Sequence, residues 1–174
     1  RVVVGHGAGA VRAALPEGVE VGEQPGQRGT GDAVACALGG LGANDTALIL
    51  YGDVPLVQPE TLRALVDAGR RADCGLLTVH LAHPGGYGRI VRGPGGAVQR
   101  IVEERDADDD ERGIDEVNTG LLAMQAGPLA RHVAGLDRDN AQGEYYLTDV
   151  VERVAAGGGH VDTVHPGFDW EVQG

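Results

Sequence analysis

The residue best placed for chemistry in this sequence is Asp53, which follows the apolar run Ala47–Leu50 within the stretch Tyr51–Leu56. A continuous apolar run predicts a strand that is buried on both faces. Ligands of open α/β sheets bind beyond the carboxyl ends of such strands. A carboxylate there suits Mg²⁺, which binds through one or two carboxylates together with phosphates and water. Asp is equally common as a turn or capping residue, so the spacing alone favours neither interpretation.

Four further segments combine glycine with polar side chains: Gln24–Ala33, Gly85–Arg89, Glu116–Gly120 and Asn140–Asp149. Glycine lets the backbone approach a ligand closely and present its N–H groups. Each segment is also explained by a turn, a bulge or a helix cap. The first segment lacks both the spacing of a dinucleotide fingerprint and the lysine of a phosphate-binding loop. Taken one at a time, these segments do not predict a ligand.

Several kinds of chemistry are excluded or disfavoured by residues that the chain lacks or spaces widely. The chain contains no serine, which excludes a serine nucleophile, and no lysine. Its six histidines show no pair at metal-ligand spacing along the sequence, so we expect structural or surface roles for them. Cys36 and Cys74 are too few for a disulfide framework or a zinc site, which favours a reduced, cytoplasmic setting. The acidic run Asp106–Glu111 is expected to be a solvated loop.

The elements that must position these residues alternate along the chain. Apolar runs predict strands at residues 2–4, 19–21, 47–50, 75–81, 117–124 and 160–164. Helical spacing and capping residues predict helices at residues 8–15, 32–38, from Pro59 onward, 128–136 and 148–156. This alternation predicts an α/β fold with a mostly parallel sheet and helices on both faces. Residues 89–92 and 97–103 flank a Gly-Pro-Gly-Gly turn and predict a small antiparallel insertion.

Length and charge narrow the function classes further. The chain has 174 residues, which fits one domain or most of one, and a net charge of −12 from 26 acidic and 14 basic side chains. This charge, without a concentrated basic stretch, argues against nucleic acid and anionic membrane surfaces as partners. No run approaches the ~20 apolar residues that a membrane-spanning helix needs.

Taken together and in order, the motifs closely resemble the uridylyltransferase domain of the GlmU family. This is the family of bifunctional N-acetylglucosamine-1-phosphate uridylyltransferase/glucosamine-1-phosphate acetyltransferases. The resemblance extends over essentially the whole chain, and its most specific segments are Tyr51–Leu56 and Asn140–Tyr146. It implies a Rossmann-like nucleotidyltransferase fold that, with Mg²⁺, joins UTP and N-acetylglucosamine 1-phosphate. The products are UDP-N-acetylglucosamine, a precursor of cell wall and lipopolysaccharide, and pyrophosphate.

The resemblance also implies eleven substrate-binding residues in three groups. The groups are Gln24, Gly29 and Thr30 for the uridine; Tyr51, Gly52 and Asp53 for the ribose and phosphates; and Gly88, Glu103, Asn118, Tyr146 and Thr148 for the sugar. Asp53 is in addition the implied Mg²⁺ ligand. The transfer itself needs in-line positioning and charge neutralisation more than covalent help, which fits a chain without a nucleophilic constellation.

The family pattern extends beyond both ends of the sequence. The family's first strand and its glycine-rich loop, which supplies a catalytic Arg and Lys, would precede Arg1, and its second metal ligand would follow Gly174. We therefore expect residues 1–174 to be a nucleotidyltransferase domain truncated at both ends. The resemblance implies a parent protein that also carries an acetyltransferase half and forms a homotrimer through a C-terminal β-helix. Two alternatives stay open: another sugar-1-phosphate nucleotidyltransferase, and a non-catalytic nucleotide-sugar-binding domain.

We predict that the 174-residue chain alone has negligible uridylyltransferase activity, because the cationic loop that stabilises the transition state lies outside it. Pyrophosphate release from UTP and N-acetylglucosamine 1-phosphate measures this activity. Robust turnover by the purified chain would contradict the prediction.

Overall fold

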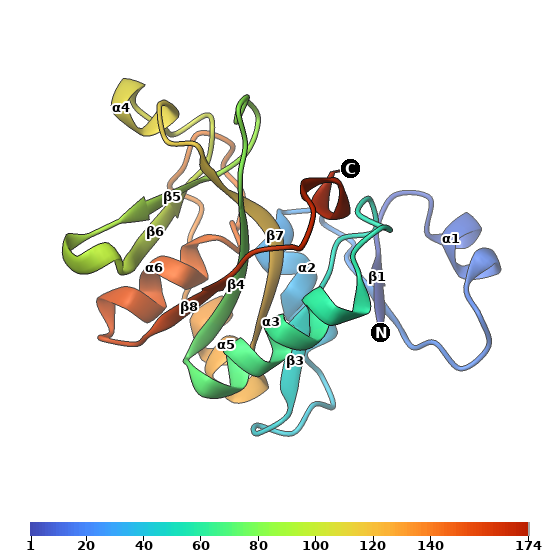
Figure 1. The fold of residues 1–174 in the computed structure, drawn as a ribbon. Helices are drawn as coiled ribbons and strands as arrows, with labels where there is room; N and C mark the ends of the chain where they lie inside the picture. Colours follow the sequence, from blue (N-terminus) through green and yellow to red (C-terminus); the bar gives the residue numbers. More distant parts are fainter. Residues whose placement is uncertain (174) are drawn as a thin grey trace.

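The computed structural model describes residues 1–173, and a six-stranded sheet forms its centre (Figure 1). Its strands are β3 (Thr46–Ile49), β4 (Cys74–His80), β5 (Arg89–Arg92), β6 (Val98–Val102), β7 (Glu116–Gln125) and β8 (Val161–Val164). The order is β6-β5-β7-β4-β8, and β3 also pairs with β7. The long strand β7 therefore contacts β4, β5 and β3.

The α/β class is confirmed, and the sheet is mixed. Strands β4 and β8 are parallel, whereas β7 runs antiparallel to β3, β4 and β5. β3, β4 and β8 share one direction, but β4–β8 is the one parallel pair of this sheet among the described residues, because β7 runs the opposite way between β4 and both β3 and β5. The expectation of a mostly parallel sheet is therefore corrected to a mixed sheet. The predicted insertion is also confirmed: β5 and β6 form an antiparallel hairpin with Ile90 opposite Ile101. Its turn contains a short 3-10 helix, η1 (Pro94–Gly96).

Helices cover both faces of the sheet, as the alternation predicts. Helix α3 (Pro59–Arg71) packs on one face, and the other face carries α2 (Thr30–Ala37), α5 (Ala126–Ala134) and α6 (Asp149–Ala156). Successive side chains of a strand point to opposite faces. On β4, Leu76 accordingly joins the core under α5 and α6, and Leu77 joins the core under α3.

The first part of the chain forms a smaller unit beside this sheet (Figure 1). Strands β1 (Val2–Val4) and β2 (Val21–Glu23) pair in parallel, and the segment that connects them contains α1 (Ala8–Ala14). No residue of α1 is buried. The main sheet and its helices therefore hold most of the core.

Two short helices were not predicted. The acidic segment expected as a solvated loop contains α4 (Asp109–Arg112), whose start is closed by reciprocal hydrogen bonds between Asp108 and Glu111. Near the end of the chain lies the 3-10 helix η2 (Asp169–Val172). Its Glu171 is 1% exposed and accepts hydrogen bonds from Thr61 Oγ1 (2.6 Å) and the backbone N–H of Gln58 (3.1 Å), which holds η2 against the start of α3. Within residues 1–173, no helix has the length and apolar character needed to cross a membrane.

We predict that Gly69→Ala lowers the free energy of unfolding by about 1–3 kcal/mol, because α3 packs on β7 without room for a methyl group. A Cβ at Gly69 would lie 2.3 Å from the carbonyl oxygen of Ala123. Urea unfolding followed by circular dichroism measures the change.

Gly9→Ala is the matched control, because Gly9 is also a helical glycine, and a Cβ there would meet no heavy atom within 4 Å apart from its chain neighbours and its own helix backbone. We expect this control to raise the free energy of unfolding by up to ~1 kcal/mol through helix propensity. Equal effects of the two substitutions would contradict the close packing of α3.

Candidate functional site

A cavity of about 370 Å³ opens where β3 ends and β7 begins. Volumes of this size are typical of small-molecule sites. Seven of the eleven predicted residues line it: Thr30, Tyr51, Asp53, Gly88, Glu103, Asn118 and Tyr146. The remaining four, which are outside the lining, are Gln24, Gly29, Gly52 and Thr148. Eight lining residues were not predicted individually: Val54, Gly86, Tyr87, Thr119, Gly120, Gln142, Glu144 and Val172.

Two glycine-containing segments that are far apart in the sequence pair at the Thr30 side of the cavity. The N–H of Tyr145 donates to the carbonyl of Arg28 (2.8 Å), and the N–H of Gly31 donates to the carbonyl of Tyr145 (2.8 Å). Gly29 has a φ of 109°, and a Cβ there would lie 2.6 Å from the Tyr145 carbonyl oxygen. Gln24 Nε2 donates to the Gly29 carbonyl (2.8 Å). Gln24 and Gly29 thus shape the loop that presents Thr30.

The ring of Tyr51 packs against the backbone of Gly120 in β7. Gly120 has a φ of 83°, and a Cβ there would lie 2.3 Å from Tyr51 Cε2, so only glycine fits. Burial raises the pKa of Tyr51, which keeps the phenol neutral. Asp53 follows two residues later, with Gly52 in the intervening turn, and its exposed carboxylate forms no ion pair within residues 1–173. Its oxygens are therefore available to a cation or a ligand.

Glu103, directly after β6, is partly buried and lines the cavity beside the backbone of Gly88. Thr148 Oγ1 donates to Glu103 Oε1 (2.9 Å), so Thr148 orients Glu103 from outside the lining. A Cβ at Gly88 would lie 2.9 Å from Ile101 Cγ2 and 3.3 Å from Glu103 Oε2. Burial, assisted by the charge of Asp106, raises the pKa of Glu103 despite the opposing hydrogen bond from Thr148.

Asn118 is held by both its backbone and its side chain. Its N–H donates to the carbonyl of Gly88 (2.8 Å), which ties β7 to the loop before β5. Its Oδ1 accepts from the N–H of Gly120 (3.0 Å). Oδ1 is positioned by this bond, whereas the side-chain NH₂ forms no hydrogen bond to the described residues, so the NH₂ is a donor that Asn118 offers to a ligand in the cavity.

Most of the lining residues that were not predicted individually belong to motifs that the sequence analysis singled out. Gly86 and Tyr87 lie in the segment 85–89, Thr119 and Gly120 in 116–120, and Gln142 and Glu144 in 140–149. Val54 lies in the stretch 51–56 beside Asp53. Val172 is different, because it enters the lining through η2, and no local signal in the sequence marks it.

A second, acidic cavity of about 360 Å³ shares Glu103 and Tyr146 with the first. Tyr146 OH accepts from Gln142 Nε2 (2.9 Å) and lies 3.3 Å from Asp106 Oδ2, to which it donates. Burial, together with surrounding carboxylates of which Glu152 contributes most, raises the pKa of Asp149 to about 6. Most charged side chains that line the second cavity are therefore carboxylates.

The comparisons with known proteins agree on the class of domain. Residues 1–116 match the family described as the MobA-like NTP transferase domain. Over 99% of its length the chain is 49% identical to the Bifunctional protein GlmU of Cupriavidus pinatubonensis (strain JMP 134 / LMG 1197) and 50% identical to that of Burkholderia mallei (strain SAVP1). The chain spans 38% of the length of these relatives.

The fold is also that of a solved nucleotidyltransferase. The structure of UDP-glucose pyrophosphorylase complexed with UDP-glucose superposes with a TM-score of 0.73 at 14% identity. The match covers 97% of this chain and 74% of that protein. At this identity the likeness shows the fold, including the mixed sheet and its covering helices.

We predict that the charge of Asp149 destabilises the folded chain at neutral pH. Its pKa of about 6 exceeds the ~3.9 of an unfolded Asp, so the stability that its protonated form contributes is present below about pH 4 and is lost as the pH rises through 6. Asp149→Asn should raise the free energy of unfolding at pH 7.5 by about 1 kcal/mol, allowing for its partial exposure, and much less at pH 4.

Urea unfolding at the two pH values measures this difference. Asp110→Asn is the control for removing one carboxylate, because Asp110 is exposed. An effect of Asp149→Asn that is the same at both pH values would refute the assignment to its ionisation.

Proposed function

Because the chain belongs to the family of MobA-like NTP transferase domains, we propose that it is a sugar-1-phosphate uridylyltransferase domain. Its substrates are UTP and N-acetylglucosamine 1-phosphate, and its products are UDP-N-acetylglucosamine and pyrophosphate. The observation that supports this most is the first cavity, where seven predicted substrate-binding residues from separate segments converge. Identity of 49–50% to proteins named Bifunctional protein GlmU supports the uridine and N-acetylglucosamine assignment.

The reaction requires that the domain align the phosphate of the sugar phosphate with the α-phosphate of UTP. A phosphate oxygen of the sugar phosphate attacks the α-phosphorus of UTP, the new P–O bond forms, and the bond to the β-phosphate oxygen breaks to release pyrophosphate. The sugar phosphate is its own nucleophile, so this transfer requires no covalent intermediate on the protein. The domain's part is to align the reacting groups and to exclude competing geometries.

The lining divides into a nucleotide end and a sugar end. At one end, Thr30 and the neutral ring of Tyr51 offer a hydroxyl and an aromatic face to uridine and ribose. At the other end, Glu103 accepts hydrogen bonds from sugar hydroxyls, and the Asn118 NH₂ donates to the acetyl carbonyl. Glycine at position 88 leaves room for the sugar against the backbone.

Asp53 is the residue that would hold a divalent metal ion, for which we propose Mg²⁺. Its carboxylate lines the cavity and is free of ion pairs within the described chain, which fits a cation that prefers one or two carboxylates, water and phosphates. When bound, Mg²⁺ neutralises phosphate charge and assists the departure of pyrophosphate. Asp53 would hold that positive charge at the cavity wall.

The properties of the complete protein are part of the same proposal. The relatives are longer than this chain and are described as bifunctional. We propose that the parent protein is cytoplasmic, joins this domain to an acetyltransferase half, and trimerises through that half. Binding of the sugar nucleotide is the property that the 174-residue chain itself should retain.

We predict that the chain binds UDP-N-acetylglucosamine and that Asn118→Asp weakens this binding at least about tenfold. The substitution keeps the acceptor for the Gly120 N–H but replaces the NH₂ that donates to the acetyl carbonyl, and a lost polar contact of this kind costs about 1.5–3 kcal/mol. Isothermal titration calorimetry measures the affinity.

Asn44→Asp is the matched control, because Asn44 is exposed before β3, at the opposite end of that strand from Asp53. UDP-glucose, which lacks the acetyl group, should bind more weakly than UDP-N-acetylglucosamine and should respond less to Asn118→Asp. Equal affinity for the two sugars, or no binding of either, would count against the proposed function.

A further inference from the structure

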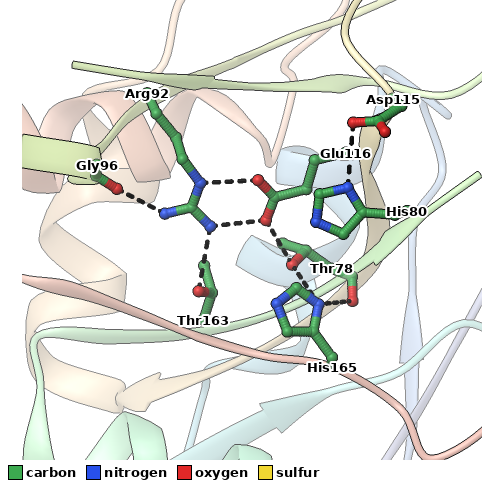
Figure 2. A network of polar contacts seen from close by, with 8 residues as sticks. All are labelled: Thr78, His80, Arg92, Gly96, Asp115, Glu116, Thr163 and His165. Carbon is green, nitrogen blue, oxygen red and sulfur yellow. Dashed lines mark hydrogen bonds and ion pairs between the residues drawn. The ribbon is translucent and has the colours of Figure 1, made fainter.

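Three side chains that are far apart in the sequence meet beside the sheet (Figure 2). His80 ends β4 and lies opposite Glu116, the first residue of β7, and His165 directly follows β8 on the other side of β4. One potential ligand atom from each lies within 4.8 Å of the others, and the two imidazole ring centroids are 5.6 Å apart. The sequence shows no histidine pair at metal-ligand spacing, but sheet pairing brings His80 and His165 together across the strands.

Both imidazoles are oriented by hydrogen bonds at Nδ1. His165 Nδ1 lies 3.0 Å from the carbonyl oxygen of Thr78, and His80 Nδ1 lies 3.1 Å from Asp115 Oδ1 (Figure 2). A carbonyl or an ionised carboxylate only accepts, so Nδ1 is the protonated nitrogen in each ring. Nε2 is then the nitrogen of each ring that can face a metal ion. Histidines that bind a metal through one ring nitrogen almost always donate a hydrogen bond from the other nitrogen to a carboxylate, a backbone carbonyl or water, as both rings do here.

Glu116 supplies a fixed carboxylate between the two rings. It is 5% exposed and accepts hydrogen bonds from Arg92 Nε (2.7 Å), Arg92 Nη2 (2.6 Å) and Thr78 Oγ1 (2.8 Å). The guanidinium of Arg92 forms two parallel hydrogen bonds to this carboxylate, the arrangement typical of an arginine–carboxylate ion pair. A carboxylate has about four acceptor positions, and three are used, which leaves one for a further partner.

We propose that His80, His165 and Glu116 form a binding site for a divalent transition-metal ion, with Zn²⁺ the best match. Two imidazoles and one carboxylate are a common protein donor set for Zn²⁺, and solvent would complete the coordination. The carboxylates of Asp115 and Glu116 against the single guanidinium of Arg92 leave a net negative charge around the ion.

The geometry needs a small local closure. Zinc bonds of about 2.0–2.1 Å place tetrahedral donors about 3.3 Å apart, so the ligand atoms must close by at most about 1.5 Å from their present separation. Both histidines are exposed and can move, whereas Glu116 is anchored by Arg92. Metal binding would then tie the segment after β8, which leads to Val172 in the cavity lining, to β4 and β7.

This site is independent of the proposed function. None of its three residues lines the first cavity, and its nitrogen donors distinguish it from Asp53, which offers oxygen alone. Mg²⁺ prefers oxygen ligands and dehydrates reluctantly, so an excess of Mg²⁺ should leave the histidine site available to Zn²⁺.

The test titrates the tag-free, metal-free chain with Zn²⁺ by calorimetry in the presence of excess Mg²⁺. We expect one equivalent to bind. His80→Asn or His165→Asn should each weaken binding at least about tenfold, and the double variant should abolish it. Asp115→Ala, which removes only the group behind His80, should weaken binding about 10- to 100-fold. Co²⁺ provides a second readout, because its visible absorption reports imidazole coordination in a tetrahedral site.

His83→Asn is the matched control, since His83 is an exposed histidine three residues beyond His80 and outside the cluster, and it should leave the affinity unchanged. Urea unfolding of each variant verifies that the fold is retained. Absence of Zn²⁺ binding by the unsubstituted 174-residue chain, or binding that survives in the His80/His165 double variant, would overturn the proposal.

Discussion

Strand β7 pairs with three strands at once, and its register sets the position of every group that it brings to the first cavity. Leu122 lies opposite both Ile49 of β3 and Leu76 of β4, and Val117 lies opposite Arg89 of β5. A slip by one residue would exchange the two faces of β7 and move Leu122 from the core under α5 and α6 to the core under α3. The irregular stretch around Gly120 is therefore held firmly, although it bends away from ideal strand geometry.

The first cavity is lined by negatively charged side chains. The whole chain carries a net charge of −12, and the lining of the first cavity within residues 1–173 includes three carboxylates and no basic side chain. Burial raises the pKa of the Tyr51 phenol and of the Glu103 carboxyl. A pair of phosphorylated substrates would add to this charge, which is why a metal ion beside Asp53 matters to the proposed reaction.

Much of the local structure follows from short-range patterns. The apolar run 47–50, the Pro59 start of α3 and the Gly-Pro-Gly-Gly turn each depend on neighbouring residues, and each was predicted in type and approximate position. The direction of β7 was not, because an apolar run looks the same whichever way its strand runs. Gln24 and Thr148 lie outside the cavity lining, and each forms a hydrogen bond to another residue near the site. A family motif does not distinguish such a supporting residue from one that contacts the ligand.

The α/β class, the family of the domain and, apart from η2, the segments that line the cavity can be recognised in the sequence, because periodicity, glycine placement and motif order are properties of the chain read in one direction. Tertiary structure alone decided which segments touch. Thr30 meets Leu147, 117 residues away, and His165 meets Thr78, 87 residues away, through hydrogen bonds that depend on strand pairing and helix packing. Local patterns report which face of a segment is buried, whereas such encounters depend on how all the buried faces fit together.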